Sequence, residues 1–391
     1  MYGLFVGVIY MREGYDIYVV RPGDTVDGIA QKYGVNVMQI IQDNQMVFPY
    51  ALAIGQALFI DLGVRLPDRS LRVSGYAYTF ISPYVLEQTL PYLSELPIFS
   101  YGFTEDGILI PPSRLEDWMI QIAKEYGVQP ILTLTPFDES GNFNNQLINS
   151  LINNPEAVER LIQNLLKTMR VKGYVGIDID FEYILAEDRD AFTAFVGRVA
   201  EVMRANGFHT SIALAPKSSA EQRGLLYEGK DYAALGAIVD HALIMTYEWG
   251  YTYGPPLAVA PINQVRRVIE YAVTEIPVAK IDLGIPNYGY DWPLPYERGI
   301  TAATTIGNVQ AVQIAITQGV EIRFDEVAQS PFFTYSDAGI EHEVWFEDVR
   351  SMEKKFELIK EFDLGGCGYW QIMRWWRANW RLLYKNFYID K

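Results

Sequence analysis

The hydrophobic and polar residues between positions 72 and 372 form a repeating pattern. Short runs with the period-2 alternation of strands are separated by longer stretches whose apolar residues lie three and four positions apart. In one such stretch Asn154 is a predicted N-cap and Pro155 the first helical residue. Strands are predicted at 72–80, 96–103, 129–135, 174–182, 209–216, 240–249, 280–289 and 365–372. Eight strand and helix units predict an α/β fold, a (β/α)8 TIM barrel, within residues 70–391.

The connection between the seventh and eighth predicted strands is longer than the others, at about 75 residues. Its stretch "VEIRFDEVAQSPFFTYSDAGIEHEVWFED" alternates between apolar and polar positions. This predicts a small α+β insertion at roughly 300–345, with antiparallel strands and hairpin turns at Ser336 to Gly339. We expect the insertion to form one wall above the C-terminal face of the barrel.

The pattern before residue 70 predicts a separate small domain over residues 15–63. It contains a short β run, a Pro-Gly-Asp turn, two short helical stripes and a closing β run. Asp24 or Thr25 would cap a helix that carries Val26 and ends at Gly34. The stretch "DLGVRLPDRS", polar and containing proline, then joins this domain to the barrel.

The first residues, "MYGLFVGVIY", are apolar but lack a basic region and a small-residue cleavage pattern, and Arg12 follows soon after. We expect residues 1–14 to form an ordered strand or packing arm, with no recognisable signal peptide and no membrane anchor.

The composition limits the classes of partner and cofactor that the protein is expected to bind. A formal net charge of −16 argues against nucleic acid, because phosphate recognition requires clustered Lys and Arg. The single cysteine, Cys367, excludes an internal disulfide and is most simply a small buried side chain. Three scattered histidines, at positions 209, 241 and 342, make a His-rich metal site improbable. We therefore expect no metal, no cofactor, no nucleic acid and no membrane partner.

The N-terminal domain follows the pattern "V..GDT...IA..Y.V.....I...N.......L..GQ.L.I" and resembles a LysM module. The resemblance implies binding to N-acetylglucosamine-containing glycans such as peptidoglycan or chitin. It also implies that the sugar lies between the loop after the first strand and the loop before the second. The glycan-binding candidates in these loops are Gly23, Asp24, Thr25, Val26, Pro49, Leu52 and Ile54. Gly23, Asp24 and Thr25 would also serve as a turn and helix cap, and the two readings are compatible.

The stretch "GYVGIDIDFEYI" places three carboxylates on every second residue of the fourth predicted strand. Asp178, Asp180 and Glu182 would share the face that points into the barrel, with Glu182 at the C-terminal end where barrel enzymes place active-site groups. Like charges so close in a poorly solvated interior cannot all ionise cheaply, so one should hold a proton near neutral pH. A carboxyl protonated at the barrel mouth suits a general acid. A purely structural acid ladder and a divalent metal site are the alternatives.

"VGIDIDFE" resembles the catalytic strand motif D-G-x-D-x-D-x-E of glycoside hydrolase family 18. The resemblance implies that Glu182 is the general acid, that Asp180 orients the 2-acetamido group of the substrate, and that Asp178 is a deeper charge and proton partner. It further implies hydrolysis of β-1,4 bonds at N-acetylglucosamine by substrate-assisted retention, without a protein nucleophile. Val175 replaces the first Asp of the motif, at a position expected to face outward.

Further residues are assigned by the same resemblance. Tyr247, in "IMTYEWG", matches a tyrosine that hydrogen-bonds the acetamido group, and Trp370, in "GGCGYWQI", matches a tryptophan that floors the sugar subsite. Glu248 stands where many family members have Asp. The stretches "ALAPKSS", "MTYEWGYTYGPPLAVAPINQVRRV" and "GIPNYGYDWPLP" resemble a narrower branch, the LysM-bearing N-acetylglucosaminidases of bacterial spores that cut cortex peptidoglycan. Within those stretches the candidate cleft residues are Lys217, Trp249, Asn287, Tyr288 and Trp292.

The sequence thus predicts a glycosidase of the spore coat or cortex, or of the cell wall, in which the LysM module holds insoluble glycan near the barrel. Two alternatives remain open at this point. One is a chitinase of the same family, and the other is a non-catalytic glycan-binding protein on the same fold.

Overall fold

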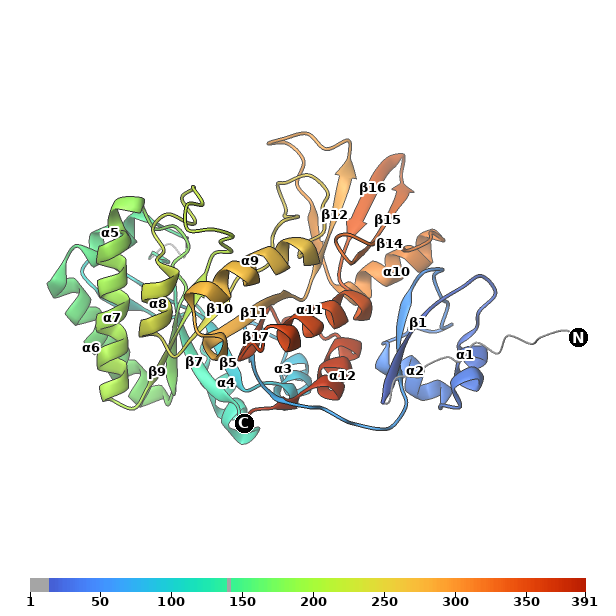
Figure 1. The fold of residues 1–391 in the computed structure, drawn as a ribbon, viewed down its shortest axis with the longest axis horizontal. Helices are drawn as coiled ribbons and strands as arrows, with labels where there is room; N and C mark the ends of the chain where they lie inside the picture. The colour runs from blue at the N-terminus through green and yellow to red at the C-terminus, as the bar shows by residue number, and fades with distance from the viewer. Residues whose placement is uncertain (1–13, 139–141) are drawn as a thin grey trace, which may run out of the picture.

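The computed structural model describes residues 14–138 and 142–391, so that the predicted N-terminal arm lies outside the described residues except for Gly14. Eight parallel strands close into a barrel, because β3 pairs with both β5 and β17 (Figure 1). The predicted TIM barrel is confirmed. In order around the barrel the strands are β3 (Ser70–Gly75), β5 (Glu95–Phe103), β7 (Gln129–Leu134), β8 (Gly176–Ile179), β9 (His209–Leu214), β10 (His241–Ile244), β11 (Ile281–Pro286) and β17 (Gly366–Trp370).

Several barrel strands end before the predicted boundary. β8 ends at Ile179 and β10 at Ile244, so Asp178 stays within β8, while Asp180, Glu182 and Tyr247 stand in the following loops. The β7–β8 register ends with Leu134 opposite Ile179, and the Asp180 N–H still donates to the Leu134 carbonyl at 3.0 Å. The alternation of side chains therefore continues for one residue after the regular ladder stops.

Helices pack around the barrel, and α6 (Pro155–Lys172) shows why these sequences are helical. The Asn154 side chain accepts from the Ala157 N–H at 3.3 Å, and Gly173 ends the helix at a φ of 83°. The buried stripe includes Leu161 and Leu165. The other helices here are α3 (Pro83–Thr89), α4 (Asp117–Glu125), α5 (Gln146–Ile152), α7 (Arg189–Ala205), α8 (Tyr232–Ile238), α9 (Ile262–Glu275), α11 (Val349–Glu361) and α12 (Arg377–Asn386), with short elements β4 (Ala77–Tyr78), β6 (Leu109–Ile110), β18 (Tyr388–Ile389), η1 (Leu90–Tyr92), η2 (Ala186–Asp188) and η3 (Val278–Lys280).

The insertion is an antiparallel sheet of five strands with one helix, α10 (Asn308–Gln318). It begins at Gly289, earlier than the predicted boundary near 300, because the chain after β11 reverses and pairs antiparallel with β16. The predicted turn holds: Ala338 and Gly339 both have positive φ and join β15 to β16. The strands are β12 (Gly289–Leu294), β13 (Thr304–Ile306), β14 (Arg323–Asp325), β15 (Ser330–Asp337) and β16 (Ile340–Trp345).

A buried ion pair ties the end of this insertion to α11. Lys355 Nζ lies 2.8 Å from Glu347 Oε2, with side-chain exposures of 1% and 0%. Replacing Lys355 by Met should lower the free energy of unfolding by about 3–5 kcal/mol, because it leaves a buried carboxyl unpaired. Denaturant unfolding would measure this loss. The double variant Lys355→Met/Glu347→Leu should recover most of it, and no recovery would contradict the explanation.

The N-terminal domain has its own small core, built from β1 (Tyr15–Val19), α1 (Val26–Tyr33), α2 (Val37–Asp43) and β2 (Ala57–Asp61). Thr25 is the N-cap, with its hydroxyl accepting from the Gly28 N–H at 3.1 Å, and Gly34 ends α1 at a φ of 66°. Asp24 instead accepts hydrogen bonds from the Tyr18 hydroxyl and the Arg21 N–H, both at 2.7 Å. The loop thus has a structural role as well as any role in binding.

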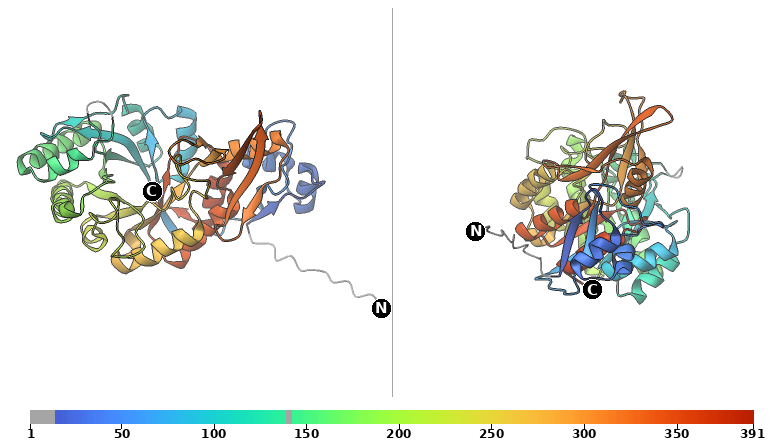
Figure 2. Two further views of the ribbon diagram at one scale, coloured as in Figure 1. Left: turned by 90° about the horizontal axis from the view of Figure 1, so that it is seen from above. Right: turned by 90° about the vertical axis from the view of Figure 1, so that its right-hand side faces the viewer.

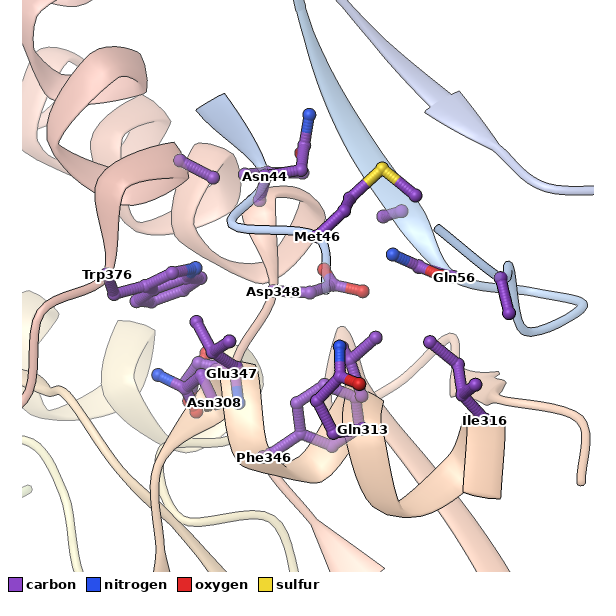
Figure 3. A pocket seen from close by; sticks show the side chains of 16 residues that line it. Asn44, Met46, Gln56, Asn308, Gln313, Ile316, Phe346, Glu347, Asp348 and Trp376 are labelled. Carbon is purple, nitrogen blue, oxygen red and sulfur yellow. Dashed lines mark hydrogen bonds between the residues drawn. The ribbon is translucent and has the colours of Figure 1, made fainter. Parts of the chain in front are cut away.

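This domain lies against the barrel and the insertion, beside α12 and α10 (Figures 1 and 2). Asp43 accepts from Arg377 at 2.8 Å, and Asp61 pairs with Lys385 at 2.5 Å. The Ile322 N–H donates to the Ile54 carbonyl at 2.9 Å. A narrow cavity of about 40 Å³ remains between the two parts, with Asn44, Met46 and Gln56 on one side and residues of α10 on the other (Figure 3). The N-terminal domain is therefore held in a defined orientation.

Candidate active site

A cleft of about 650 Å³ opens at the C-terminal ends of the barrel strands. It brings together Asp180, Glu182, Tyr247, Glu248 and Trp370 from three loops and strand ends that are far apart in the sequence. Aromatic side chains form much of the remaining wall, including Tyr76, Tyr78, Phe99, Phe143, Tyr183 and Tyr251, none of which was predicted. Aromatic faces beside a few carboxyl groups are typical of a carbohydrate site, because sugar rings have apolar faces and polar edges.

Asp178, Asp180 and Glu182 form what we call the acidic series. Asp178 lies at the bottom of this series and is completely buried. Its two oxygens accept hydrogen bonds from the Ser211 hydroxyl at 2.7 Å and the Tyr76 hydroxyl at 3.0 Å. Burial raises the pKa of Asp178 to about 6, although these two hydrogen bonds oppose the shift. Asp178 can therefore hold or release a proton near neutral pH.

Asp180 and Glu182 lie above Asp178, and burial raises their pKa values as well. Burial raises the pKa of Asp180 well above its ordinary value, and the charges of Glu182 and Asp178 raise it further. Burial also raises the pKa of Glu182, which is half-buried at the cleft. Asp180 Oδ1 has no hydrogen-bond partner among the described residues. The series thus holds protons near neutrality, with one carboxylate oxygen of Asp180 unengaged.

The apolar residues between the acids face the other way, toward the helices. Ile177, Ile179 and Phe181 are completely buried in the main core. The Phe181 ring stacks on Phe195 of α7, with centroids 5.7 Å apart. Burial of these side chains fixes the register, since a slip by one residue would turn the acids into the hydrophobic layer.

Lys230 is the charged neighbour of the acids that sequence reasoning missed. Its side chain is buried, at 1% exposure, and Nζ has no hydrogen-bond partner among the described residues. Its positive charge opposes the rise in pKa of both Glu182 and Asp180, and burial lowers its own pKa to about 8. A single lysine in a polar loop usually indicates a solvated side chain, so the sequence carried no signal for this position.

The segment that carries Lys230 packs closely against the loop after β8, which carries Asp180 and Glu182. A Cβ on Gly229 would lie 2.4 Å from the Ile184 carbonyl oxygen, so only glycine permits this approach. Lys217 was predicted to face the cleft, but this is wrong: its buried Nζ donates to the Lys230 carbonyl at 3.1 Å. This residue after β9 thus supports the segment that carries Lys230 instead of lining the cleft.

Tyr247 and Glu248 enter the cleft together from the loop after β10. Tyr247 is buried, and burial and the nearby acids raise its pKa well above the ordinary value. Glu248 accepts hydrogen bonds from the Tyr288 hydroxyl and from the Tyr290 hydroxyl, the latter at 2.9 Å. Tyr288 therefore orients Glu248 from behind, and Tyr290 connects it to the first strand of the insertion.

Two predicted cleft tryptophans and Asn287 lie elsewhere. Trp292 has 0% exposure and donates from Nε1 to the Gly254 carbonyl at 2.8 Å, so its predicted contact with sugar is wrong. Trp249 packs half-buried against the main core. Asn287 is buried and donates to the carbonyls of Gln371 and Arg374, which places it in a neighbouring cavity. Trp249 and Asn287 lie outside regular strands, and Trp292 lies on β12 of the insertion instead of on a barrel strand, so alternation along the barrel strands does not give their directions.

Trp370 ends β17 and forms an aromatic surface in the cleft. Its ring centroid lies 5.0 Å from that of Phe99 and 5.8 Å from that of Tyr78, in edge-to-face arrangements. These contacts hold the indole in place while part of it stays exposed. Its position agrees with a role in stacking on a sugar face.

Comparison with known families gives the same architecture. Residues 140–374 match the family model "Glycosyl hydrolases family 18", and residues 18–61 match that of the LysM domain. The chain belongs to glycosyl hydrolases family 18.

This family 18 glycosidase also has relatives that match it over nearly its whole length. It is 38% identical to the "Cortical fragment-lytic enzyme" of Bacillus subtilis (strain 168), over 96% of this chain and 99% of that protein. It is 35% identical to the "Putative sporulation-specific glycosylase YdhD" of the same organism, over 96% and 88%. Among solved structures, the Bacillus cereus spore cortex-lytic enzyme SleL matches with a TM-score of 0.91 and 33% identity, over 97% of this chain and 99% of that one.

The LysM domain of the hydrolase presents only some of its predicted glycan residues to solvent. Gly23, Thr25, Pro49 and Ile54 are exposed, and Asp24 and Leu52 are half-buried. Val26 is in the core, so its predicted contact with glycan is wrong. The most exposed aromatic ring of the domain is one that sequence reasoning missed, Phe48, at 80% exposure beside Pro49.

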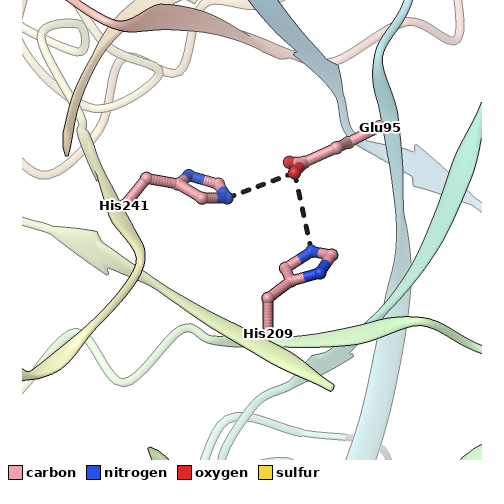
Figure 4. Close-up of side chains that lie close together, drawn as sticks. All are labelled: Glu95, His209 and His241. Atoms are coloured by element: carbon pink, nitrogen blue, oxygen red, sulfur yellow. Dashed lines mark ion pairs between the residues drawn. The ribbon is translucent and has the colours of Figure 1, made fainter. Parts of the chain in front are cut away.

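A second titratable cluster lies at the opposite, N-terminal end of the hydrolase barrel. His209 and His241 both direct Nε2 toward Glu95 Oε1, at 3.5 and 3.3 Å (Figure 4). His241 Nδ1 is 2.7 Å from Asp282, which also pairs with Arg72 at 2.6 Å. The Glu95, His209 and His241 ligand atoms lie within 4.8 Å of one another, a spacing that a metal ion could use. Two carboxylates matched by Arg72 and a protonated His241 already balance the charge, which favours an ion-pair network.

This network predicts a bell-shaped dependence of stability on pH. Burial alone would lower the pKa of His241, but Glu95 and Asp282 raise it from 6.5 to about 10. Its stabilisation is therefore complete below 6.5 and is lost as the pH rises toward 10. His241, together with His209 and Arg72, lowers the pKa of Glu95 from 4.5 to about 2, so that contribution is lost as the pH falls from 4.5 toward 2.

Thermal unfolding from pH 2 to 10 would test this prediction. The Tm of a His241→Gln variant should fall less steeply than that of the native protein between pH 6.5 and 10. His342→Gln is the matched control, because His342 pairs with Asp291 in the insertion and lies outside the network. Parallel curves for the native protein and His241→Gln would contradict the ion-pair explanation.

Proposed function

We propose that this family 18 glycosidase cleaves β-1,4 bonds at N-acetylglucosamine in peptidoglycan of the spore cortex, by substrate-assisted retaining catalysis. The observation that carries the proposal is the acidic series, in which Asp178 is buried, Asp180 has an unengaged oxygen and Glu182 lines the cleft. The two relatives named for cortex lysis, which this chain matches over nearly its whole length, support the choice of cortex peptidoglycan over chitin.

In the first step Glu182 donates its proton to the glycosidic oxygen as the bond from C1 to that oxygen breaks. The acetamido oxygen of the same sugar attacks C1, and the product is an oxazolinium ion. Asp180 would accept from the acetamido N–H through its free oxygen, and Tyr247 would donate to the acetamido oxygen. In the second step water attacks C1, Glu182 takes up the proton of that water, and the anomeric configuration is retained.

Mass spectrometry of fragments released from cortex peptidoglycan and from chitin would test the proposed substrate. We expect fragments of cortex peptidoglycan that end in reducing N-acetylglucosamine. Fragments from chitin alone would replace the proposed substrate by chitin. Binding without fragments from either polymer would identify a glycan-binding protein and contradict the enzymatic proposal.

The LysM domain would position the insoluble glycan at a spore or cell-wall surface, and Phe48 is its exposed aromatic anchor. A Phe48→Ala variant should bind intact sacculi about tenfold more weakly, because one stacking surface is lost. Hydrolysis of short soluble fragments should not change. A pull-down with sacculi measures the first effect, and Tyr126→Ala, which removes a 41%-exposed ring after α4, is the control. Equal binding by Phe48→Ala and the native protein would exclude this anchor.

A further inference from the structure

A second cavity, of about 470 Å³, lies where the LysM domain, α10 and the loop before α12 meet. We call it the junction pocket. It is lined by two indoles, those of Trp375 and Trp376, by five side-chain amides and by the guanidinium of Arg374. Arg374 is the only charged residue among the described residues that line the pocket, although the chain carries a formal net charge of −16. A lone cation among amides and indoles is suited to an acidic, sugar-like ligand.

The guanidinium of Arg374 has no carboxylate partner among the described residues. Its backbone is fixed, since the Arg374 carbonyl accepts from Asn287 Nδ2 at 2.9 Å. Gly307 leaves room for its stem, because a Cβ there would lie 2.9 Å from Arg374 Cδ. Burial alone lowers the pKa of Arg374, without an acid to oppose the effect. A charge held half-buried and unpaired costs stability, which a bound anion would restore.

A second donor independent of Arg374 points to the same pocket. Asn308, the first residue of α10, has 4% exposure; its Oδ1 accepts from the Glu347 N–H at 3.0 Å, and Nδ2 has no partner among the described residues. The preceding Gly307 has no side chain with which to cap the first turn of α10. The first turn of α10 with its positive helix end, the residue that carries an unpartnered amide N–H₂, and Arg374 therefore all line one pocket.

The pocket lies next to the catalytic cleft and is closed on one side by the LysM domain. Asn287 donates to the Gln371 carbonyl at 3.0 Å, immediately after Trp370 of the cleft, as well as to that of Arg374. From the other side Gln45 of the LysM domain donates to the Trp375 carbonyl at 3.3 Å and accepts from the Arg377 N–H at 2.6 Å. A glycan that passes from the cleft toward the LysM domain would meet the pocket.

We propose that the junction pocket binds a carboxylate group of an acidic glycan, with Arg374 as the anion-binding residue. The proposal rests on the proposed function, because peptidoglycan carries carboxylates on its stem peptides and on the lactyl group of muramic acid that bears no peptide, whereas chitin carries none. The pocket would thereby select peptidoglycan over neutral N-acetylglucosamine polymers.

Steady-state kinetics with Arg374→Gln tests the proposal. The KM for soluble glycan fragments that bear carboxylates should rise about tenfold, because a charge-assisted hydrogen bond is lost. The kcat should stay unchanged, as should the KM for chito-oligosaccharides of the same length. Arg374→Lys should restore part of the affinity, since lysine keeps the positive charge but cannot form the two parallel hydrogen bonds of a guanidinium. Arg377→Gln is the matched control: it removes the same charge three residues away, where the guanidinium is already paired with Asp43.

Substrate variants then separate the two sources of the carboxylate. An effect of Arg374→Gln that persists on peptide-free glycan and disappears when the lactyl carboxylate is amidated identifies the lactyl group. An effect seen only with peptide-bearing fragments identifies the stem peptide. Equal changes on carboxylated and neutral fragments, or no change on either, overturn the proposal. If the protein releases nothing from peptidoglycan, the proposed function fails, and calorimetric titration of carboxylated fragments into native protein and Arg374→Gln still decides whether the pocket binds them.

Discussion

A Glu182→Gln variant should lose roughly a hundredfold to ten-thousandfold of its kcat on N-acetylglucosaminides, the range found when a general acid and base is removed. Glutamine keeps the size of the side chain and its hydrogen bonding, but it has no proton to give to the leaving oxygen and cannot accept one from water. Burial raises the pKa of Glu182, so the native side chain supplies that proton near neutrality. Release of a chromophore from an aryl N-acetylglucosaminide measures the loss.

Binding provides the necessary control for Glu182→Gln. Affinity for a glycan oligosaccharide should stay within about twofold, because the amide preserves the shape of the cleft. Glu187→Gln, which changes an exposed glutamate in η2 only five residues away, should leave kcat unchanged. If Glu182→Gln turned over substrate at the native rate, neither Glu182 nor the acidic series could be the catalytic machinery.

A Lys230→Met variant should lower kcat/KM by about tenfold to a hundredfold and should also move its pH profile. The ammonium of Lys230 opposes the rise in pKa of Glu182 and Asp180. Without it the pKa of Glu182 rises further, so the acid becomes weaker and the carboxylate left after proton transfer is less well stabilised. The alkaline limb of the kcat/KM profile, where Glu182 loses its proton, should therefore shift to higher pH.

The pH shift distinguishes this electrostatic role from a structural one. Lys355→Met removes another fully buried lysine, remote from the cleft, and should lower stability without moving the pH profile. Lys230→Arg keeps the charge and should recover part of the rate and the native profile. A Lys230→Met enzyme with a lower rate but an unmoved alkaline limb would show that Lys230 acts through packing alone.

Because the LysM domain is docked on the barrel, the two domains would work together differently from two domains joined by a free linker. A module on a free linker raises the local concentration of glycan without choosing its direction. Here ion pairs from Asp43 and Asp61 to α12, with a backbone hydrogen bond to the insertion, fix the module relative to the cleft. A glycan strand held by Phe48 would thus approach the barrel along a restricted path.

The sequence by itself determined the barrel, the LysM domain and the acidic series. In each case the signal is contiguous: eight strand patterns, one motif of about 46 residues, and the alternation of Asp178, Asp180 and Glu182 with buried apolar residues. Period-2 and period-3.6 patterns survive in a single sequence because each residue is placed by its near neighbours. The hairpin at Ala338 and Gly339 was readable for the same reason.

Only the tertiary structure decided which distant side chains meet. Lys230 faces the acids across 48 residues of chain because Gly229 allows two loops to approach, and no local pattern encodes that contact. Trp292 and Lys217 point away from the cleft because Trp292 lies on a strand of the insertion and Lys217 follows the end of β9, where alternation along the barrel strand no longer gives direction. Arg374 and Asn308 line one pocket only once the insertion has packed against the loop before α12. Electrostatic sites depend on distances in space, and the packing of the whole chain sets those distances.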